Sequence, residues 1–513
     1  MASLKWLLDQ LPTVILLLPL AYTACLVTVA IYNVMFHPLS KFPGPKLRGA
    51  FYFPQYWDIY TGLSVQKTKK LHDKYGDTVR ISPTTLSYTN SQAWKGKKKS
   101  IYIYGNRQGK PVITKDKEVY YGGGDGVADI IISNDVDHAR MRRLLSHAFS
   151  ESALREQESL ITKYLDLLIE KLHDQGRHDE QCTVDLVHWY NFTTFDILGD
   201  LCFDESFGAL AKGQYHSWVA NIFRSLKFAR MFRVFRAYPI VGNVVFALFR
   251  LFPQATRAGA EHRALTAKKA EQRFERQTDR RDFMSYILRH NDEKGMTREE
   301  IKATSGILII AGSETTATLL SGATFYLLKN PLCLMKAVDE VRQAFLRASD
   351  ITFESVTTRL PYLNACLEET LRIYPPVPSV LPRRTGPEGD IINGRFVAPN
   401  VSVGVHPWSA YLSVSNFRDP EVFAPERWLG DNRFANDDLA ACQPFSLGPR
   451  GCLGKNLAYA EMRSIMARML WNFDLELCKD SEDWARQKVF ILWDKPALNV
   501  RLRARKVVPT EGK

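Results

Sequence analysis

The sequence has no pair of cysteines at the spacing of a zinc site, and its eight cysteines are scattered singly along 513 residues. This distribution excludes a disulfide-rich secreted domain and is typical of a reduced compartment. The chain also lacks internal repeats and long low-complexity segments. Its 68 Lys and Arg exceed its 55 Asp and Glu, giving a net charge of +13. Because no basic-aromatic stripe or RNA-binding signature accompanies that charge, nucleic acid is not expected as a partner.

Charged side chains are missing from Gln10 through Phe36. The stretch 13–36 is long enough to cross a bilayer as one helix, and Pro19 is tolerated in such a helix. A buried core helix is the first alternative, disfavoured by the position at the extreme N-terminus. A cleaved signal peptide is the second, but its apolar region would be shorter and its start more basic. We therefore expect a short lumenal N-terminus at 1–12 and a transmembrane anchor at 13–36.

Basic residues follow the predicted anchor closely, at Lys41, Lys46 and Arg48. Positive charge tends to stay on the cytosolic side, which places everything after residue 36 in the cytosol. Three prolines between residues 38 and 45 stiffen the connection. The sequence thus predicts a proline-rich hinge at 37–48 and one large cytosolic domain at 49–513.

That domain reads as mainly helical from about residue 64 to 380, with apolar residues at helical spacing in 136–150 and 153–176. The fold class is therefore mainly α with a smaller β region. The segment 230–254 mixes Arg with Phe and Val around Pro239. It is read either as a second, shallow membrane contact or as a mobile flap over a pocket.

One predicted helix carries an unusual polar cluster. Thr297 and Glu300 form a capping-box signature at its start, and it should stop before Pro331. Its middle is apolar except for AGSETT at 311–316. A buried Glu314 is costly unless it is paired or functional, and Gly312 costs about 1 kcal/mol against Ala. The cluster favours a locally opened helix beside a ligand, with a polar face touching solvent as the alternative.

Two further motifs suggest a buried charge network. Glu369 and Arg372 lie three residues apart on one helical face, where they can pair. Arg427 in FAPERW supplies a second guanidinium. One carboxylate with two arginines is better evidence for fixing geometry than for net stability.

The stretch FSLGPRGCLG at 445–454 has few side chains able to build a core. Its glycines, including Gly454, let the backbone approach a flat partner and point N–H groups at a sulfur. Phe445 can cover the sulfur of Cys452, and Arg450 offers donors to a carboxylate. Because a helix follows, Cys452 precedes a helix N-terminus, where negative charge is favoured. This combination suits an axial thiolate ligand of haem iron.

Together these motifs resemble the cytochrome P-450 monooxygenases of the membrane-anchored, microsomal kind, over nearly the whole chain. FSLGPRGCLG matches the family's haem-binding signature, and AGSETT resembles its oxygen-activation motif. ETLR at 369–372 and PERW resemble its Glu-x-x-Arg pair and second arginine motif. The hinge and residues 137–150 are most similar to filamentous-fungal members of secondary metabolism.

The resemblance implies a cytochrome P-450 fold with haem b as cofactor and Cys452 as its axial ligand. It implies that the haem propionates are reached by Arg450, His138, Arg142 and Arg383, with Arg384 as a substitute for Arg383. His138 replaces the family's Trp, although an imidazole can still donate a hydrogen bond. Thr315 would steady the iron-bound oxygen, and Glu314 would relay protons to it. Glu369, Arg372 and Arg427 would be structural.

The implied activity is insertion of one oxygen atom from O2 into a lipophilic substrate, by hydroxylation, epoxidation or multi-step oxidation. The chain has no flavin or dinucleotide fingerprint, so electrons must come from NADPH through a partner. NADPH-cytochrome reductase is that partner, with cytochrome b5 as a further candidate. Arg140, Arg142, Arg143 and Lys455 would attract its acidic face. The resemblance places the protein in the endoplasmic reticulum membrane, single-pass, with a cytosolic catalytic domain.

The substrate is expected to be a fungal terpenoid, polyketide or alkaloid, because the candidate pocket linings are apolar. These linings are Tyr102–Tyr121, Ile307–Ala311, Val377–Val380 and Phe490–Trp493. Detoxification of xenobiotics or aromatic acids is the alternative. A haem-thiolate isomerase or dehydratase, and a haem sensor without turnover, are less favoured because neither needs the acid and alcohol pair at 314 and 315.

Overall fold

The protein is described by a computed structural model, which covers residues 19–94, 103–105, 112–120, 127–176, 182–215, 254–276 and 280–505, with residues 17 and 278 and short pieces between 233 and 247. The segment predicted to touch the membrane at 230–254 lies mostly outside these residues.

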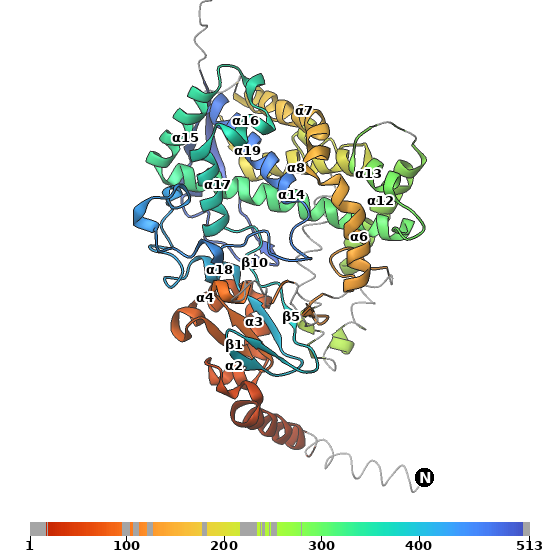
Figure 1. Cartoon of the computed structure of the whole chain (residues 1–513), viewed down its shortest axis with the longest axis vertical. Coiled ribbons are helices and arrows are strands. Elements are labelled where there is room, and N and C mark those ends of the chain that lie inside the picture. The colour runs from red at the N-terminus through yellow and green to blue at the C-terminus, as the bar shows by residue number, and fades with distance from the viewer. Residues whose placement is uncertain are drawn as a thin grey trace, which may run out of the picture.

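Helices dominate the described part of the chain (Figure 1). They are α2 (Lys46–Ala50), α3 (Phe53–Thr61), α4 (Ser64–Tyr75), α5 (Ser91–Trp94), α6 (Asp135–Ala148), α7 (Glu151–Gly176), α8 (Leu186–Phe203), α9 (Ala209–Lys212), α12 (Gln254–Glu275), α13 (Phe283–His290), α14 (Arg298–Lys329), α15 (Pro331–Ala344), α16 (Phe353–Thr358), α17 (Pro361–Ile373), α18 (Pro407–Tyr411) and α19 (Lys455–Asn472). The short π-helix η1 spans Tyr32–Phe36. The short 3-10 helices are η2 (Pro38–Lys41), η3 (Ala348–Asp350), η4 (Pro425–Leu429), η5 (Asn432–Phe434), η6 (Leu439–Ala441) and η7 (Lys479–Ser481).

The strands are short and form a smaller β region, as predicted. They are β1 (Thr78–Ser82), β2 (Thr85–Tyr88), β3 (Thr114–Lys115), β4 (Thr183–Asp185), β5 (Arg383–Arg384), β6 (Asp390–Ile392), β7 (Arg395–Val397), β8 (Ser402–Val405), β9 (Phe473–Leu477), β10 (Val489–Phe490), β11 (Leu492–Trp493) and β12 (Asn499–Ala504). A five-stranded sheet has the order β1-β2-β8-β5-β3, and β4-β12-β9 form a second sheet. Only β2 and β8 pair in parallel; the other described pairs are antiparallel.

Two large hydrophobic cores follow this division. The first joins α7, α8, α14, α17 and α19 and includes Phe195, Leu320 and Met466. The second lies on the five-stranded sheet and includes Tyr88, Trp94 and Val403. In Figure 1 the helical region and the sheet form opposite ends of the molecule, with the loop before α19 between them.

The long helix α14 runs through the middle of the helical region (Figure 1). Its start has the predicted capping box, in which Thr297 Oγ1 accepts from the N–H of Glu300 and the Glu300 carboxylate accepts from the N–H of Thr297. The expected local opening is wrong, because α14 is continuous from Arg298 to Lys329. Gly312 instead allows α8 to approach: a Cβ there would lie 3.1 Å from Leu198 Cδ1.

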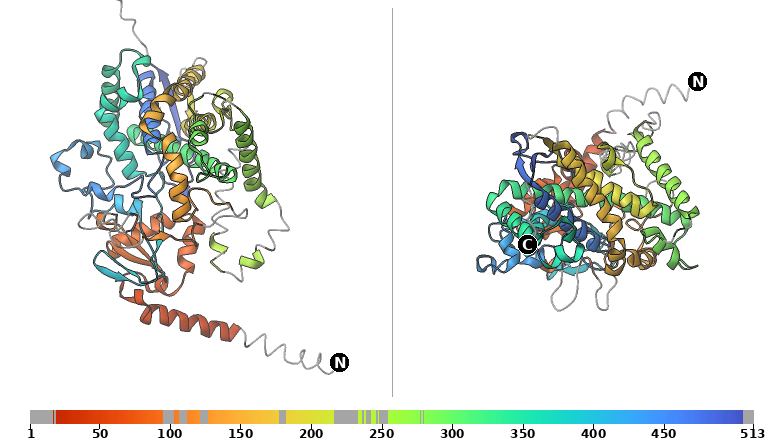
Figure 2. Two further views of the ribbon diagram at one scale, coloured as in Figure 1. Left: turned by 45° about the vertical axis from the view of Figure 1, so that its right-hand side comes forward. Right: turned by 90° about the horizontal axis from the view of Figure 1, so that it is seen from above.

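The apolar helix Pro19–Phe36 projects from the sheet end of the molecule (Figures 1 and 2), and only 6% of it is buried. Its mean hydropathy is 1.6, which suits a membrane span. α14 also passes the length and hydropathy test, but 67% of its apolar window is buried inside the protein. α14 is therefore a core helix, whereas Pro19–Phe36 fits a single membrane anchor by its length, composition and exposure.

Glu369 lies at the centre of a buried charge network between α17 and η4. Its carboxylate accepts two hydrogen bonds from Arg372, at 2.7 and 2.8 Å. It also accepts from the backbone of Ala424 at 3.0 Å and the indole of Trp428 at 2.9 Å. Arg427 Nε is 3.5 Å from Glu369 Oε2. The three charged side chains are 0% exposed. Arg372 depends on Glu369 for its compensation, while Arg427 also pairs with the buried side chain of Asp437.

Replacing Glu369 by Gln should lower the free energy of unfolding by about 3–5 kcal/mol, because it leaves Arg372 buried without a counter-charge, whereas Arg427 keeps Asp437. Denaturant unfolding of the full chain in detergent measures this. Glu421→Gln is the control, since that side chain is 78% exposed and should change stability by under about 0.5 kcal/mol. Equal effects of the two substitutions would contradict the network's role.

Candidate active site

The loop that carries Cys452 is closed on itself just before α19. The N–H of Cys452 donates to the carbonyl of Phe445 at 2.8 Å, and the N–H of Gly451 donates to that of Gly448 at 2.9 Å. Gly448 has φ +75°, and a Cβ there would lie 2.2 Å from the carbonyl oxygen of Tyr104. Glycine is therefore required for the loop to turn and to lie against the Tyr104 backbone.

Cys452 keeps an accessible surface, although protein atoms crowd its sulfur. Burial raises the pKa of Cys452, while the N–H of Gly454 and the charges of Arg142 and Lys455 act in the opposite direction. Arg142 Nη1 also donates to the carbonyl of Gly451 at 2.6 Å. The net effect is a raised pKa, which Arg142, Lys455 and the N–H of Gly454 limit. Binding of the sulfur to a metal ion would favour its anionic form.

Four successive polar residues of α14 point toward four different neighbours, as expected for about 100° of rotation per residue. Ser313 Oγ donates to the carbonyl of Thr194 in α8 at 3.1 Å. Glu314 pairs with Lys495, and Thr315 Oγ1 donates to the carbonyl of Ala311 at 2.6 Å. Thr316 is buried near Glu461 of α19.

The turn Ala311–Thr315 is regular helix, but two of its side chains are accessible in an otherwise buried part of α14. Ala311 is exposed and Thr315 partly exposed, whereas Ser313, Glu314 and Thr316 are all buried. Cys452 lies just before α19, which packs on α14 in the same core. Because Ala311 and Thr315 lie in the middle of a packed helical region, we infer that they line an interior space and not the outer surface.

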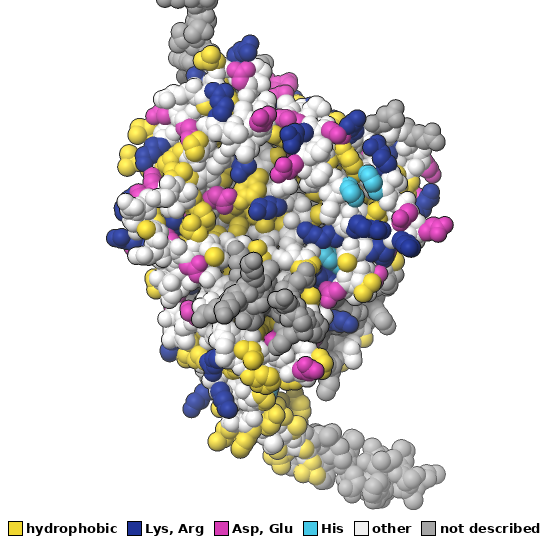
Figure 3. Space-filling view, in the orientation of Figure 1, with side chains coloured by type: hydrophobic (Ala, Val, Ile, Leu, Met, Phe, Trp, Pro, Cys, Tyr) yellow, Lys and Arg dark blue, Asp and Glu magenta, His cyan; other side chains and the backbone are white. Residues whose placement is uncertain are grey.

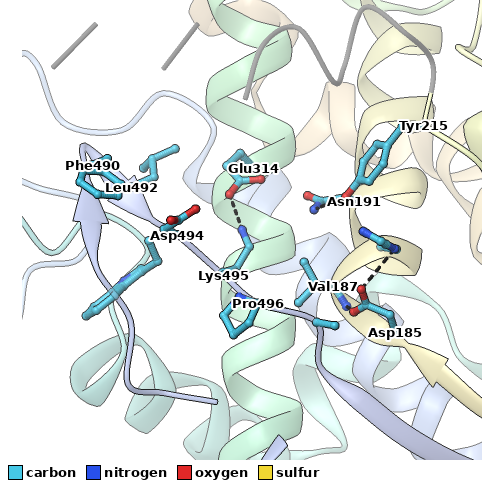
Figure 4. A pocket seen from close by; sticks show the side chains of 13 residues that line it. Asp185, Val187, Asn191, Tyr215, Glu314, Phe490, Leu492, Asp494, Lys495 and Pro496 are labelled. Carbon is cyan, nitrogen blue, oxygen red and sulfur yellow. Dashed lines mark hydrogen bonds and ion pairs between the residues drawn. The ribbon is translucent and has the colours of Figure 1, made fainter. Parts of the chain in front are cut away.

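Glu314 and Lys495 form a buried ion pair at the edge of a pocket of about 250 Å³ (Figure 4). Lys495 Nζ also donates to Thr318 Oγ1 at 2.6 Å. Glu314 Oε2 has no hydrogen-bond partner among the described residues. Burial raises the pKa of Glu314, and the charge of Lys495 lowers it. Asp185, Asn191 and Asp494 add polar groups to the wall.

A cluster of cationic side chains lies on the other side of the Cys452 loop. His138 is 5% exposed, and burial together with Arg450 and Arg142 lowers its pKa to about 4. Arg450 donates to Asp135 at 2.8 Å and to the carbonyl of Ser133 at 2.7 Å.

Lys115 belongs to this cluster because β3 pairs with β5, which sets it directly opposite Arg383. Burial, Arg450 and Arg383 lower the pKa of Lys115 to about 7. Like charges opposite each other on a sheet are destabilising. The cluster therefore has more positive charge than its own carboxylates balance.

The residues present fit a haem. Arg383 and Arg450 each have a buried Nη1 without a partner in the described part of the chain, and two carboxylates would satisfy both. Arg384 is already engaged with Asp116 at 2.8 Å, so Arg383 is the better propionate candidate. Phe445 packs on Tyr459 with ring centroids 5.1 Å apart, beside the sulfur loop. When bound, haem would be held by the Cys452 thiolate and by this cationic cluster.

These features define a haem-binding protein with a cysteine at the iron side, and the comparisons with known proteins identify the family. The cytochrome P450 family description matches residues 43–499. Cytochrome P450 monooxygenase aclL of Aspergillus oryzae is 46% identical over 482 residues, covering 93% of this chain and 96% of the relative. Cytochrome P450 monooxygenase astA of Talaromyces wortmannii is 45% identical, covering 93% and 95%.

A third relative, the trichothecene C-4 hydroxylase of Trichoderma arundinaceum, is 41% identical and covers 93% of this chain and 94% of its own. The chain belongs to the cytochrome P450 family. It is a haem-thiolate monooxygenase and groups with those of fungal secondary metabolism. Molecular oxygen, a small organic substrate and an electron donor are accordingly its partners.

Sequence reasoning missed Lys115, Lys495 and Glu461. Glu461 is buried, and burial raises its pKa to about 8. Its spacing from Thr316 along the chain carries no signal, because the two meet only when α14 packs on α19. Lys115 likewise meets Arg383 only through the pairing of β3 with β5. Lys495 meets Glu314 from a loop near the C-terminus.

Replacing Lys115 by Met should speed haem loss by about tenfold, because it removes a positive charge from the cluster with Arg383 and Arg450 that would face the propionates. The rate of haem transfer to an excess of a haem-scavenging protein measures this. Lys117→Met is the matched control, since Lys117 is exposed two residues away. Equal rates for the two variants would remove Lys115 from the haem site.

Proposed function

We propose that this monooxygenase oxidises a lipophilic fungal natural product of terpenoid type, with Cys452 as the axial ligand of the haem iron. The observation that carries the proposal is the exposed turn Ala311–Thr315 inside a buried helix, together with an exposed Cys452 at the start of the helix packed on it. Haem with a thiolate ligand supplies the activation of O2 that this reaction requires.

The protein's own part is to position groups and deliver protons. Thr315 offers a hydroxyl in the open turn, and Glu314 offers a carboxyl on the next position of the helix. Because Glu314 is buried, its proton exchange must run through the pocket that it lines with Asp494 and Lys495. An acid and an alcohol at adjacent helix positions suit general acid transfer in a dry site. Glu314 would exchange protons with water in the pocket, and Thr315 would face the interior space.

Apolar residues support a lipophilic substrate. Ile307, Ile310 and Ala311 are incompletely buried on α14, and so are Val377, Ser379 and Val380 after α17. Sites of this composition bind hydrophobic ligands with few polar contacts. That one relative is named for hydroxylation of a trichothecene supports a terpenoid core. Parts of the predicted lining at 102–121 lie outside the described residues.

Electrons would come from NADPH through NADPH-cytochrome reductase, with cytochrome b5 as a second donor. Arg143 is 57% exposed and Lys455 is exposed beside the Cys452 loop. Arg140 is engaged with Glu300 at 2.6 Å, which leaves a narrower basic face than the sequence suggested. Such a face would orient an acidic partner more than it would tighten binding.

The protein would reside in the endoplasmic reticulum membrane. Residues 1–12 would be lumenal, 13–36 the anchor, 37–48 the hinge and 49–513 the cytosolic catalytic domain. The basic residues Lys41 and Lys46, both exposed, support this orientation.

The reduced, carbon-monoxide-bound spectrum of microsomes containing the chain tests the axial ligand. The wild type should show the strongly red-shifted Soret band of thiolate-ligated haem, and Cys452→Ala should lose it because no other thiolate can take its place. Cys478→Ala is the control and should keep the band. A red-shifted band in Cys452→Ala would overturn the assignment.

Lys495→Met tests the proton path. Without the cation, the pKa of the buried Glu314 rises further, so the alkaline limb of the pH profile, where a general acid loses its proton, should move to higher pH. The product formed per NADPH should fall severalfold, with peroxide released instead, while the carbon monoxide spectrum stays unchanged. Lys488→Met, an exposed position on the same loop, should match the wild type. Unchanged product per NADPH in Lys495→Met would exclude the ion pair from the path.

A further inference from the structure

Two buried acceptor atoms face one pocket from neighbouring helices. Glu314 Oε2 of α14 and Asn191 Oδ1 of α8 each have no hydrogen-bond partner among the residues that the structure describes. The two residues are 3% and 1% exposed, and both line the pocket of about 250 Å³ that Figure 4 shows. A buried acceptor is costly to leave unpaired, and a bound water molecule can serve two such atoms at once.

Asn191 has a fixed position relative to Glu314. Its Nδ2 donates to Tyr215 Oη at 3.1 Å, which sets the orientation of the amide. One turn further along α8, the carbonyl of Thr194 accepts from Ser313 Oγ at 3.1 Å. Because Ser313 directly precedes Glu314, this bond between the two helices holds the amide and the carboxyl on adjoining walls of the pocket.

The Glu314 carboxyl uses one of its two oxygens for contacts within the protein. Oε1 accepts from Lys495 Nζ and, at 3.4 Å, from Thr318 Oγ1. In Figure 3, charged side chains are spread over the outer surface of the described helical region, where solvent surrounds them. The side chains of Glu314 and Lys495 are each only 4% exposed. Oε2 is therefore the oxygen that can exchange a proton, and the pocket is its route to water.

The pocket reaches solvent at the beginning of α8. His188 has a side chain that is 51% exposed, and its Nδ1 lies 3.2 Å from Asp185 Oδ2. Asp185 also accepts from two backbone N–H groups, at 2.9 and 3.0 Å, so its carboxylate is fixed at the pocket wall. Asp185, His188 and Asn191 follow one another at intervals of three residues and line the same pocket. Along this side of α8 the pocket thus passes from an exposed histidine to a buried amide.

We propose that Asn191 is a positioning residue of the proton path, in which its Oδ1 holds a water molecule against Glu314 Oε2. This rests on the relay role of Glu314 proposed above. Once Glu314 has passed its proton toward Thr315, Oε2 is a carboxylate oxygen. The held water then protonates it: a water O–H bond breaks as the Oε2–H bond forms. The water regains a proton from the next water on the side of His188.

A neutral amide suits this role because it orients water without taking up the proton. The amide oxygen accepts a hydrogen bond and adds no charge. A carboxylate at the same position would still hold water, but its negative charge would raise the pKa of Glu314. A leucine side chain would fill a similar volume and hold no water. Since Asn, Asp and Leu are similar in size, they separate the effects of hydrogen bonding, charge and packing.

Stopped-flow infrared spectroscopy of the full haem-loaded chain in detergent tests the role. The C=O band of protonated Glu314 is the band that Glu314→Gln removes. After dilution into D2O, the exchange of H for D in this band should be about tenfold slower in Asn191→Leu, because the path has lost one hydrogen bond. Thr193→Val is the matched control and should exchange like the wild type. Thr193 is buried in the same helix, bonded to the carbonyl of Trp189 at 2.8 Å, and does not line the pocket.

Asn191→Asp is the second variant, and it decides the matter where Asn191→Leu does not load haem. Its Glu314 band, identified with Glu314→Gln in the same background, should exchange within about twofold of the wild type and persist to higher pH. Wild-type exchange in Asn191→Leu, or an unchanged pH midpoint in Asn191→Asp, would overturn the role of Asn191 alone. If Glu314→Gln removed no exchangeable carboxyl band between about pH 5 and pH 9, the Glu314 relay itself would be wrong.

Discussion

The structure depends on one constraint: α14 is buried along most of its 32 residues, and yet the side chains of one turn in its middle stay accessible. A helix that is apolar on every side belongs inside a core, and α7, α8, α17 and α19 provide that core. Ser313, Glu314 and Thr316 are consequently each buried against a different neighbour. Ala311, Gly312 and Thr315 stay accessible on the remaining side of this turn. The chemistry at Thr315 is therefore a consequence of how completely the remaining faces of α14 are covered.

The buried charges fall into two kinds, and the difference between them locates the cofactor. The network of Glu369, Arg372 and Arg427 is closed, because Arg372 pairs with Glu369, and Arg427 pairs with both Glu369 and Asp437. The cluster around Arg383 and Arg450 is open, because Arg383 forms no ion pair with a described residue and its Nη1 has no hydrogen-bond partner there. A closed network holds the fold together. An open cationic cluster requires an anion from outside the polypeptide, and haem propionates meet that requirement.

The sequence alone predicted the features that local chemistry determines. The capping box at Thr297 set the start of α14, and Pro331 marked its end. The predicted opening at Gly312 was wrong, because the sequence could not show that Leu198 of α8 needs the space of the missing Cβ. Lys115 and Lys495 were not predicted, since their partners come from a strand pair and a loop far along the chain.

The hairpin β10–β11 contacts both the C-terminal end of α3 and the pocket that holds Glu314. One side of it packs against Gly62, where a Cβ would lie 2.4 Å from the ring of Phe490. The other side, with Leu492 and Trp493, lines the pocket of Glu314 and Lys495. Because the contact at Gly62 leaves no spare room, a displacement of α3 must move the hairpin as well. The wall of the pocket that holds Glu314 therefore depends on where α3 is packed.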